Sequence, residues 1–184
     1  MPTSSELLYN TSPDLARTLL LQRDGCCDDF CLAPAKPGDV GLDLPVRVRG
    51  MQGYALPIKL SKEDKYKRWI NFEEGWVDIP PQAFVSLPAG LRVKIPDDAW
   101  GMIKPRSSTG WKRHLLVFEG TIDSGYIGPL ACLVFNPMPN SIRVHDGEKL
   151  AQLVIVPKYP LAGIRVVEEL PSTVRGVTGF GSSG

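Results

Sequence analysis

Residues 105–109 (PRSST) place a guanidinium beside consecutive hydroxyl groups, directly after the apolar run 100–103. An arginine donates charge-assisted hydrogen bonds to phosphate oxygens, and serine hydroxyls add neutral donors. Arg106, Ser107 and Ser108 are therefore candidate phosphate-binding residues. The same residues also fit the start of a helix capped by a serine, and this segment alone leaves both interpretations open.

A second segment, residues 120–128 (GTIDSGYIG), combines glycines with one acid and one tyrosine. The glycines would let a hairpin approach a ligand closely, and Tyr126 offers a flat face to a base or a sugar. Asp123 is the only acid between Glu119 and Asp146, so it is the candidate general base of this segment. A plain hairpin with a packed tyrosine is the alternative interpretation.

Two further segments place polar residues on predicted strands. Residues 38–44 (GDVGLDL) carry Asp43, although a turn with acids before a strand is common and indicates little alone. In residues 147–154 (GEKLAQLV), Gln152 interrupts an apolar run that predicts a buried strand. A buried amide must be hydrogen-bonded, which favours a ligand or an interface at Gln152.

The C-terminal residues 175–184 (RGVTGFGSSG) are rich in glycine and hydroxyl groups. Such a segment cannot build a core, so we expect it to be mobile until a ligand orders it. Its backbone, with Arg175, Ser182 and Ser183, would form a phosphate cradle, and Phe180 could stack on a ring.

The composition excludes several classes of protein. The chain has 184 residues, 43% hydrophobic and 22% charged, with a formal net charge of +1, which is typical of one globular domain without a large nucleic-acid-binding surface. No apolar run approaches the ~18 residues that a membrane span needs. Cys26, Cys27 and Cys31 lack the paired spacing of a zinc site, so we expect free thiols in a reducing cytoplasm.

The 18 glycines and 17 prolines favour many short strands joined by turns over a helical bundle. Alternating or continuous apolar runs predict strands at residues 46–49, 91–95, 130–135 and 150–156. We therefore expect an all-β domain.

The only strong helix signal lies near the N-terminus. A cap-like start at residues 12–14 (SPD) precedes Leu15 and Leu19 on one helical face, and Gly25 is the expected stop. The chain is thus divided into an N-terminal helical extension, a β domain with a charge-dense insertion, and a glycine-rich tail. The expected boundaries are residues 1–29, residues 30–170 with the insertion at about 61–78, and residues 171–184.

In this order the segments resemble the five motifs of the trimeric dUTPase (dUTP pyrophosphatase) family, most specifically in GTIDSGYIG, GEKLAQLVIVP and GFGSSG. The resemblance implies a distorted jelly-roll β-barrel and a homotrimer whose active sites are shared between subunits. It also implies hydrolysis of dUTP to dUMP and pyrophosphate, with Mg²⁺ bound through the triphosphate and water rather than by protein ligands. This reaction would supply dUMP and limit uracil in DNA, and it needs no nucleic-acid or membrane partner.

The resemblance also implies a role for each matching residue. Asp123 would orient and deprotonate the attacking water, and Tyr126 would pack on the deoxyribose and exclude a ribose 2′-hydroxyl. Asp43 would support the site without binding the metal. Arg106, Ser107, Ser108 and Gln152 would bind the phosphates, and Gly120, Ile122 and Gly181 would also bind the substrate. The backbone of residues 123–128 would read uracil and Phe180 would stack on it, while Arg175, Ser182 and Ser183 would close over the phosphates.

Two positions depart from the dUTPase pattern. Ser108 stands where the second motif usually has glycine, and Gly125 stands where the third usually has a second acid; both resemble dCTP deaminase, a sister family. A deaminase would need a glutamate where this chain has Leu133 and would lack the glycine-rich tail, so we favour the pyrophosphatase. The alternatives are a bifunctional deaminase and pyrophosphatase, or a dUTPase-like regulatory binding protein acting through the insertion. The expected location is the cytoplasm, or the host cytoplasm for a viral protein.

Overall fold

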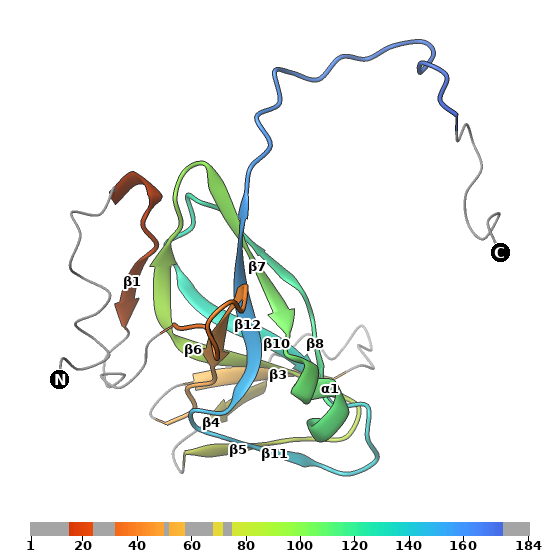
Figure 1. Cartoon of the computed structure of the whole chain (residues 1–184). Coiled ribbons are helices and arrows are strands. Elements are labelled where there is room, and N and C mark those ends of the chain that lie inside the picture. The colour runs from red at the N-terminus through yellow and green to blue at the C-terminus, as the bar shows by residue number, and fades with distance from the viewer. Residues whose placement is uncertain (1–14, 24–31, 50–51, 58–67, 72–74, 175–184) are drawn as a thin grey trace.

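The computed structural model describes residues 15–23, 32–49, 52–57, 68–71 and 75–174 (Figure 1). In chain order the elements are the 3-10 helix η2 (Leu15–Arg17), β1 (Leu20–Arg23), β2 (Gly41–Pro45), β3 (Gln52–Pro57), β4 (Arg68–Asn71), β5 (Trp76–Ile79), β6 (Ala83–Lys94), β7 (Ala99–Pro105), α1 (Ser107–Arg113), β8 (Leu116–Val117), β9 (Gly120–Ile122), β10 (Pro129–Phe135), β11 (Ile142–His145) and β12 (Lys149–Pro157).

The strands form two large antiparallel sheets and one two-stranded ribbon. One sheet has the order β4-β3-β6-β10-β8, with β1 added to β6, and the other has the order β2-β12-β7-β9. β5 and β11 pair with each other. Most strands pair with partners distant in the chain, as in a jelly roll. The expected all-β class is confirmed, and α1 is the one α-helix among the described residues.

Apolar and polar side chains alternate along the strands, and the apolar faces of the two large sheets pack together as one core. In β6, Val85 and Leu87 are fully buried, whereas Ser86 and Arg92 are partly exposed. Leu153 of β12 joins the same apolar cluster from the second sheet. Each such side chain stabilises the fold by about 2 kcal/mol when it is removed from water. The core thereby fixes the strands whose ends carry the candidate site residues.

The expected N-terminal helix is wrong over residues 20–23. Among the described residues of this extension, Leu15–Arg17 forms one helical turn, and Leu20–Arg23 is strand β1, paired antiparallel with residues 91–94 of β6. Leu19 and Leu21 both pack against the core, a spacing of two that suits a strand and not a helix. The cap-like residues 12–14 and Gly25 lie outside the described residues.

Three of the four predicted strands coincide with β6, β10 and β12, and the strand predicted at 46–49 is displaced to Gly41–Pro45. The backbone N–H groups of Val48 and Arg49 donate to the Asp146 carboxylate instead of a neighbouring strand. Val46 and Val48 are nevertheless buried. Their alternation therefore indicates burial rather than strand pairing.

The insertion expected at residues 61–78 is too long at its C-terminal end. Trp76–Ile79 is β5, in which Val77 and Ile79 are buried in the core. Arg68–Asn71 is β4, which pairs with β3. Residues 58–67 and 72–74 lie outside the described residues, so an insertion there stays a prediction.

Residues 158–174 follow β12 and extend away from the barrel (Figure 1), and all of them are exposed. In the described part of the chain no strand or helix follows Pro157. The described β domain therefore ends there, before the expected boundary at residue 170. None of the described helices is long and apolar enough to cross a membrane.

Candidate active site

Asp43 of β2 lies at the centre of a cationic cluster. Its carboxylate contacts Arg106 Nε at 2.8 Å and Lys149 Nζ at 3.1 Å, and its side chain is only 6% exposed. A buried carboxylate needs such partners, because removing an unpaired charge from water is costly. Two cations around one acid leave the cluster with a net positive charge, which suits a phosphate-bearing ligand.

Residues 105–109 contain the predicted helix start, but no serine caps it. Helix α1 begins at Ser107, and the backbone N–H of Arg106 donates to the Leu150 carbonyl. Thr109 is buried, and its hydroxyl donates to the same carbonyl at 2.6 Å. Arg106 is the N-cap residue but makes no side-chain capping bond. Its guanidinium pairs with Asp43 instead, at the edge of a pocket.

That pocket has a volume of about 250 Å³. Gln152 lies opposite Asp43 in the β2–β12 ladder, and its Nε2 donates to the Pro105 carbonyl at 3.2 Å. Because Gln152 is partly exposed, the expectation of a buried amide is wrong, and a ligand can reach the side chain. Gly41 lies close beside it, since a Cβ there would come within 1.9 Å of Gln152 Oε1. The lining residues are Ala35, Asp39, Val40, Gly41, Asp43, Arg106, Ser107 and Gln152.

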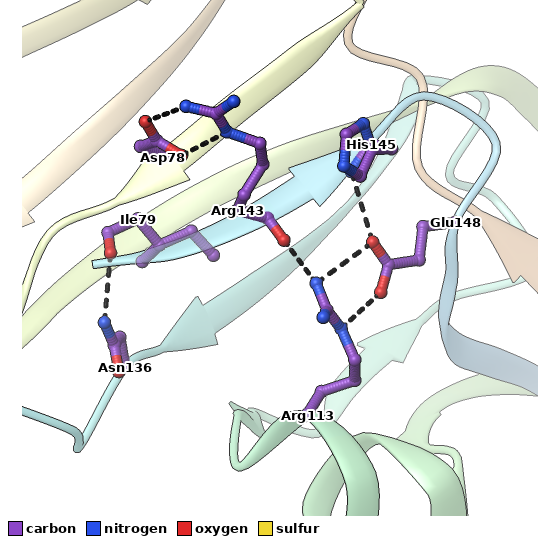
Figure 2. A network of polar contacts seen from close by, with 7 residues as sticks. All are labelled: Asp78, Ile79, Arg113, Asn136, Arg143, His145 and Glu148. Atoms are coloured by element: carbon purple, nitrogen blue, oxygen red, sulfur yellow. Dashed lines mark hydrogen bonds and ion pairs between the residues drawn. The ribbon is translucent and has the colours of Figure 1, made fainter. Parts of the chain in front are cut away.

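A polar network joins α1, β5, β11 and the turn before β12 (Figure 2). Arg113 at the end of α1 pairs with Glu148 at 2.5 Å and donates to the Arg143 carbonyl. Arg143 forms hydrogen bonds of 2.8 and 2.9 Å with Asp78, and its guanidinium lies 3.6 Å from the Trp76 ring centre. The network joins the C-terminal end of α1, whose N-cap residue is Arg106, to the turn before β12, whose first residue is Lys149.

The Arg143 hydrogen bond lowers the pKa of Asp78, which keeps this carboxylate ionised. Sequence reasoning missed the network because its partners are distant, with 65 positions between Asp78 and Arg143. Lys149 was missed for another reason. A register shift between Lys149 and Ala151 breaks the alternation of β12, so the strand pattern gives no sign that Lys149 reaches the same carboxylate as Arg106.

Residues 120–128 form a crossover between the two large sheets and not the expected hairpin. β9 pairs with β7, whereas β10 pairs with β6 and β8. The backbone N–H of Tyr126 donates to the Asp123 carbonyl at 3.0 Å, which closes a tight turn. In the described part of the chain the exposed Asp123 carboxylate makes no hydrogen bond or ion pair. Its oxygens are therefore open to solvent within one copy of the chain.

Tyr126 lies at the surface of this turn, 43% exposed. Its hydroxyl donates to the Pro129 carbonyl at 3.0 Å, and its ring lies over Gly128, where a Cβ would come within 2.5 Å of that hydroxyl. Gly120 is partly exposed. Ile122 is 9% exposed and belongs to the core, so it can offer a ligand only its backbone.

One copy of the chain does not bring Asp123 to the cationic pocket. Ile122 pairs with Gly101 near the start of β7, whereas Gln152 pairs with Lys104 near its end. Because a strand rises about 3.3 Å per residue, these two levels are about 10 Å apart, and Asp123 lies one step further away. The predicted site residues therefore form two separate groups within the described chain.

The remaining predicted site residues lie outside the described residues: Arg175, Phe180, Gly181, Ser182 and Ser183. The same holds for Cys26, Cys27 and Cys31. Cys132 is described, and burial raises its pKa to about 12. It is a protonated core side chain with no access to a ligand.

The all-β fold and the cationic pocket suit a protein that binds a phosphate-bearing ligand. The dUTPase family profile matches residues 76–184. The deoxyuridine 5′-triphosphate nucleotidohydrolase of Escherichia phage T5 is 39% identical over 108 residues, which cover 58% of this chain and 72% of that protein. The deoxyuridine 5′-triphosphate nucleotidohydrolase of Gloeothece citriformis is 36% identical over 136 residues, which cover 68% of this chain and 93% of that protein. The Staphylococcus bacteriophage 80alpha dUTPase, solved with dUpNHpp, is 26% identical with a TM-score of 0.69, over 91% of this chain and 98% of that one. This chain belongs to the dUTPase family, and it hydrolyses dUTP to dUMP and pyrophosphate.

Proposed function

We propose that Asp123 activates the water that attacks the α-phosphorus of dUTP, at active sites shared between copies of the chain in a homotrimer. The carboxylate accepts a proton as the water oxygen bonds to phosphorus, and the bond from phosphorus to the bridging oxygen breaks, so that pyrophosphate leaves. The observation that carries this proposal is the free Asp123 carboxylate, on the same sheet as the cationic pocket but away from it.

The cationic pocket supplies the phosphate end of the site. Asp43 holds Arg106 at Nε, so the guanidinium is oriented before the substrate arrives. The hydroxyls of Ser107 and Ser108 and the amide of Gln152 add neutral donors for the triphosphate. These groups would stabilise the charge that develops on the leaving pyrophosphate.

The pocket fits a Mg²⁺ ion that is held through the substrate. The two oxygens of Asp43 face Arg106 and Lys149, and no group of three His, Cys, Asp or Glu side chains among the described residues could hold a metal. Phosphate oxygens and water are suitable Mg²⁺ ligands, and the ion would neutralise charge on the departing pyrophosphate. A dUTPase of phage phi11 with the same fold coordinates a structural Mg(II) ion.

An apolar stripe on the outer face of the second sheet supports the homotrimer. Trp100 and Met102 of β7 pair with Val156 and Val154 of β12, and all four side chains are partly exposed. Packing between identical copies would remove this stripe from water. Further exposed apolar side chains lie along residues 158–174: Tyr159, Leu161, Ile164, Val166 and Leu170.

The side chains of residues 175–184 have the chemistry to complete the site. Arg175, Ser182 and Ser183 carry phosphate donors, Gly181 permits a close approach of the backbone, and Phe180 offers a ring to uracil. The match to the dUTPase family extends through residue 184.

The alternatives have less support. Leu133 of β10 cannot transfer a proton, so the base of a dCTP deaminase has no counterpart there. Incubation with dUTP, dCTP or dTTP, with uracil products resolved from pyrophosphate, separates deamination from hydrolysis. A regulatory binding role through the insertion stays a prediction, because residues 58–67 and 72–74 lie outside the described residues.

Shared active sites predict that two impaired variants restore activity to each other. Asp123→Asn removes the base and Arg106→Ala removes a phosphate ligand, so each homotrimer should be strongly impaired. After co-expression with two different tags and purification through both, a site works when its pocket and its base both come from unmutated segments, which holds for one of the three sites in every mixed heterologous ring. We expect purified mixed trimers to hydrolyse dUTP at about a third of the wild-type rate. No recovery in mixed trimers would contradict shared sites.

Tyr126→Ala should admit UTP as a substrate. A ring packed on the deoxyribose leaves no room for a 2′-hydroxyl, and alanine restores that room. The ratio of kcat/KM for dUTP to that for UTP should fall by about tenfold or more, while kcat/KM for dUTP changes less. Tyr126→Phe is the matched control, since it keeps the ring and loses only the hydrogen bond to Pro129. An unchanged preference for dUTP would show that another residue excludes the ribose.

A further inference from the structure

Lys158, the first residue after β12, joins three segments at the edge of the barrel that carries Asp123. Its backbone N–H donates to the Asp98 carbonyl at 2.7 Å. Its Nζ donates to the Asp97 carbonyl at 2.9 Å and to Ser124 Oγ at 2.7 Å. The Lys158 ammonium therefore connects the turn between β6 and β7 to Ser124, the residue that follows Asp123. Because Lys158 directly follows β12, the end of that strand is connected to Ser124 as well.

Ser124 lies inside the turn that presents the Asp123 carboxylate. Gly125 beside it faces open space, with nothing within 4 Å of the position of a Cβ. The side chain of Tyr126 bonds to Pro129, the first residue of β10, which directly follows the crossover. Among the described residues, the bond between Lys158 and Ser124 is the one side-chain hydrogen bond that links the turn 123–126 to a segment outside the crossover and the strands that flank it.

We propose that Lys158 is a positioning residue for dUTP hydrolysis, acting through Ser124 to hold the Asp123 carboxylate within hydrogen-bond reach of the water that attacks the α-phosphorus. This inference rests on the proposed role of Asp123. A general base must lie within hydrogen-bond reach of the attacking water, and a displacement of about 1 Å can cost about a hundredfold in rate. An exposed turn that has one side-chain contact with a distant segment depends on that contact for its position.

The test compares Lys158→Met with Lys158→Arg in steady-state hydrolysis of dUTP. Methionine keeps an unbranched stem and loses the donor, whereas arginine keeps a cationic donor. We expect kcat to fall about tenfold in Lys158→Met with KM changed less than about twofold, because the phosphate ligands lie elsewhere, and Lys158→Arg to recover most of the rate.

Lys94→Met is the matched control for this experiment. The Lys94 ammonium contacts the Asp97 carboxylate and the Ile95 carbonyl in the same corner, but it does not reach Ser124. This variant removes another lysine of the same corner, the last residue of β6, and should leave kcat unchanged. A loss of kcat equal to that of Lys158→Met would overturn the inference, because the corner as a whole and not the Ser124 contact would then be responsible.

A double-mutant cycle with Ser124→Ala separates positioning from a general loss of structure. If Lys158 acts through Ser124, then Ser124→Ala lowers kcat to a similar extent, and Lys158→Met adds little to it while the melting temperature stays near that of the wild type. Additive losses, or a normal kcat in Lys158→Met while Asp123→Asn is impaired, would overturn the inference and leave the role of Asp123 intact. Full activity of Asp123→Asn would overturn the proposed function and this inference together.

Discussion

Asp123→Asn should lower kcat for dUTP hydrolysis by about 10²–10⁴-fold, the range expected when a general base is lost. Asparagine has nearly the same shape as aspartate but is a poor proton acceptor. The Asp123 side chain is exposed and makes no hydrogen bond or ion pair within the described chain, so the substitution disturbs no packing. Steady-state release of pyrophosphate and single-turnover formation of dUMP measure the loss directly.

Binding of a non-hydrolysable analogue separates lost chemistry from a lost site. The affinity of Asp123→Asn for dUpNHpp with Mg²⁺ should stay close to that of the wild type, because the proposed phosphate ligands are unchanged. Asp98→Asn is the matched control, since Asp98 is an exposed acid at the same edge of the barrel and its backbone carbonyl, not its side chain, accepts from Lys158. Near-normal turnover in Asp123→Asn would contradict its assignment as the base.

The sequence predicted the pocket best where its chemistry is local. Residues 105–109 hold a guanidinium, two hydroxyls and a helix start within one short segment, and the structure places Arg106 and Ser107 at one pocket. Asp43 and Gln152 lie far apart in the chain, and only the antiparallel register of β2 and β12 sets them opposite each other. Lys149 and the network around Arg113 depend on such register entirely, so residue type and spacing alone could not predict them.

Local patterns failed where tertiary pairing decides the conformation. Leu15 and Leu19 match one helical face, yet β6 offers a free edge to residues 20–23, and a strand there buries Leu21 together with Leu19. Residues 120–128 have the glycines of a hairpin, but their flanking strands pair with different sheets. In both cases the local sequence suits two structures, and the partner strand selects one of them.

Arg106→Ala should lower kcat/KM for dUTP by a hundredfold or more, and Arg106→Lys by about tenfold to a hundredfold. The guanidinium has two roles that a smaller group cannot combine. Its Nε pairs with the buried Asp43 at 2.8 Å, and its planar fork is shaped to bind phosphate oxygens. Lysine keeps the charge but has a single ammonium, so it would serve either Asp43 or the substrate. Steady-state kinetics with dUTP and titration with dUpNHpp measure the two losses.

The stability of the same variants shows whether Asp43 acts through Arg106. Arg106→Ala leaves the Asp43 carboxylate, 6% exposed, with Lys149 as its remaining charged partner, and an under-satisfied buried acceptor costs about 1–3 kcal/mol. Adding Asp43→Asn removes the buried charge, so the double variant should unfold at a higher temperature than Arg106→Ala while its kcat/KM stays low. If Asp43 positions Arg106, adding Asp43→Asn should restore thermal stability without restoring kcat/KM, because no other group replaces Arg106 at the phosphates. Recovery of kcat/KM together with stability in the double variant would show instead that Arg106 serves the fold and does not bind the phosphates.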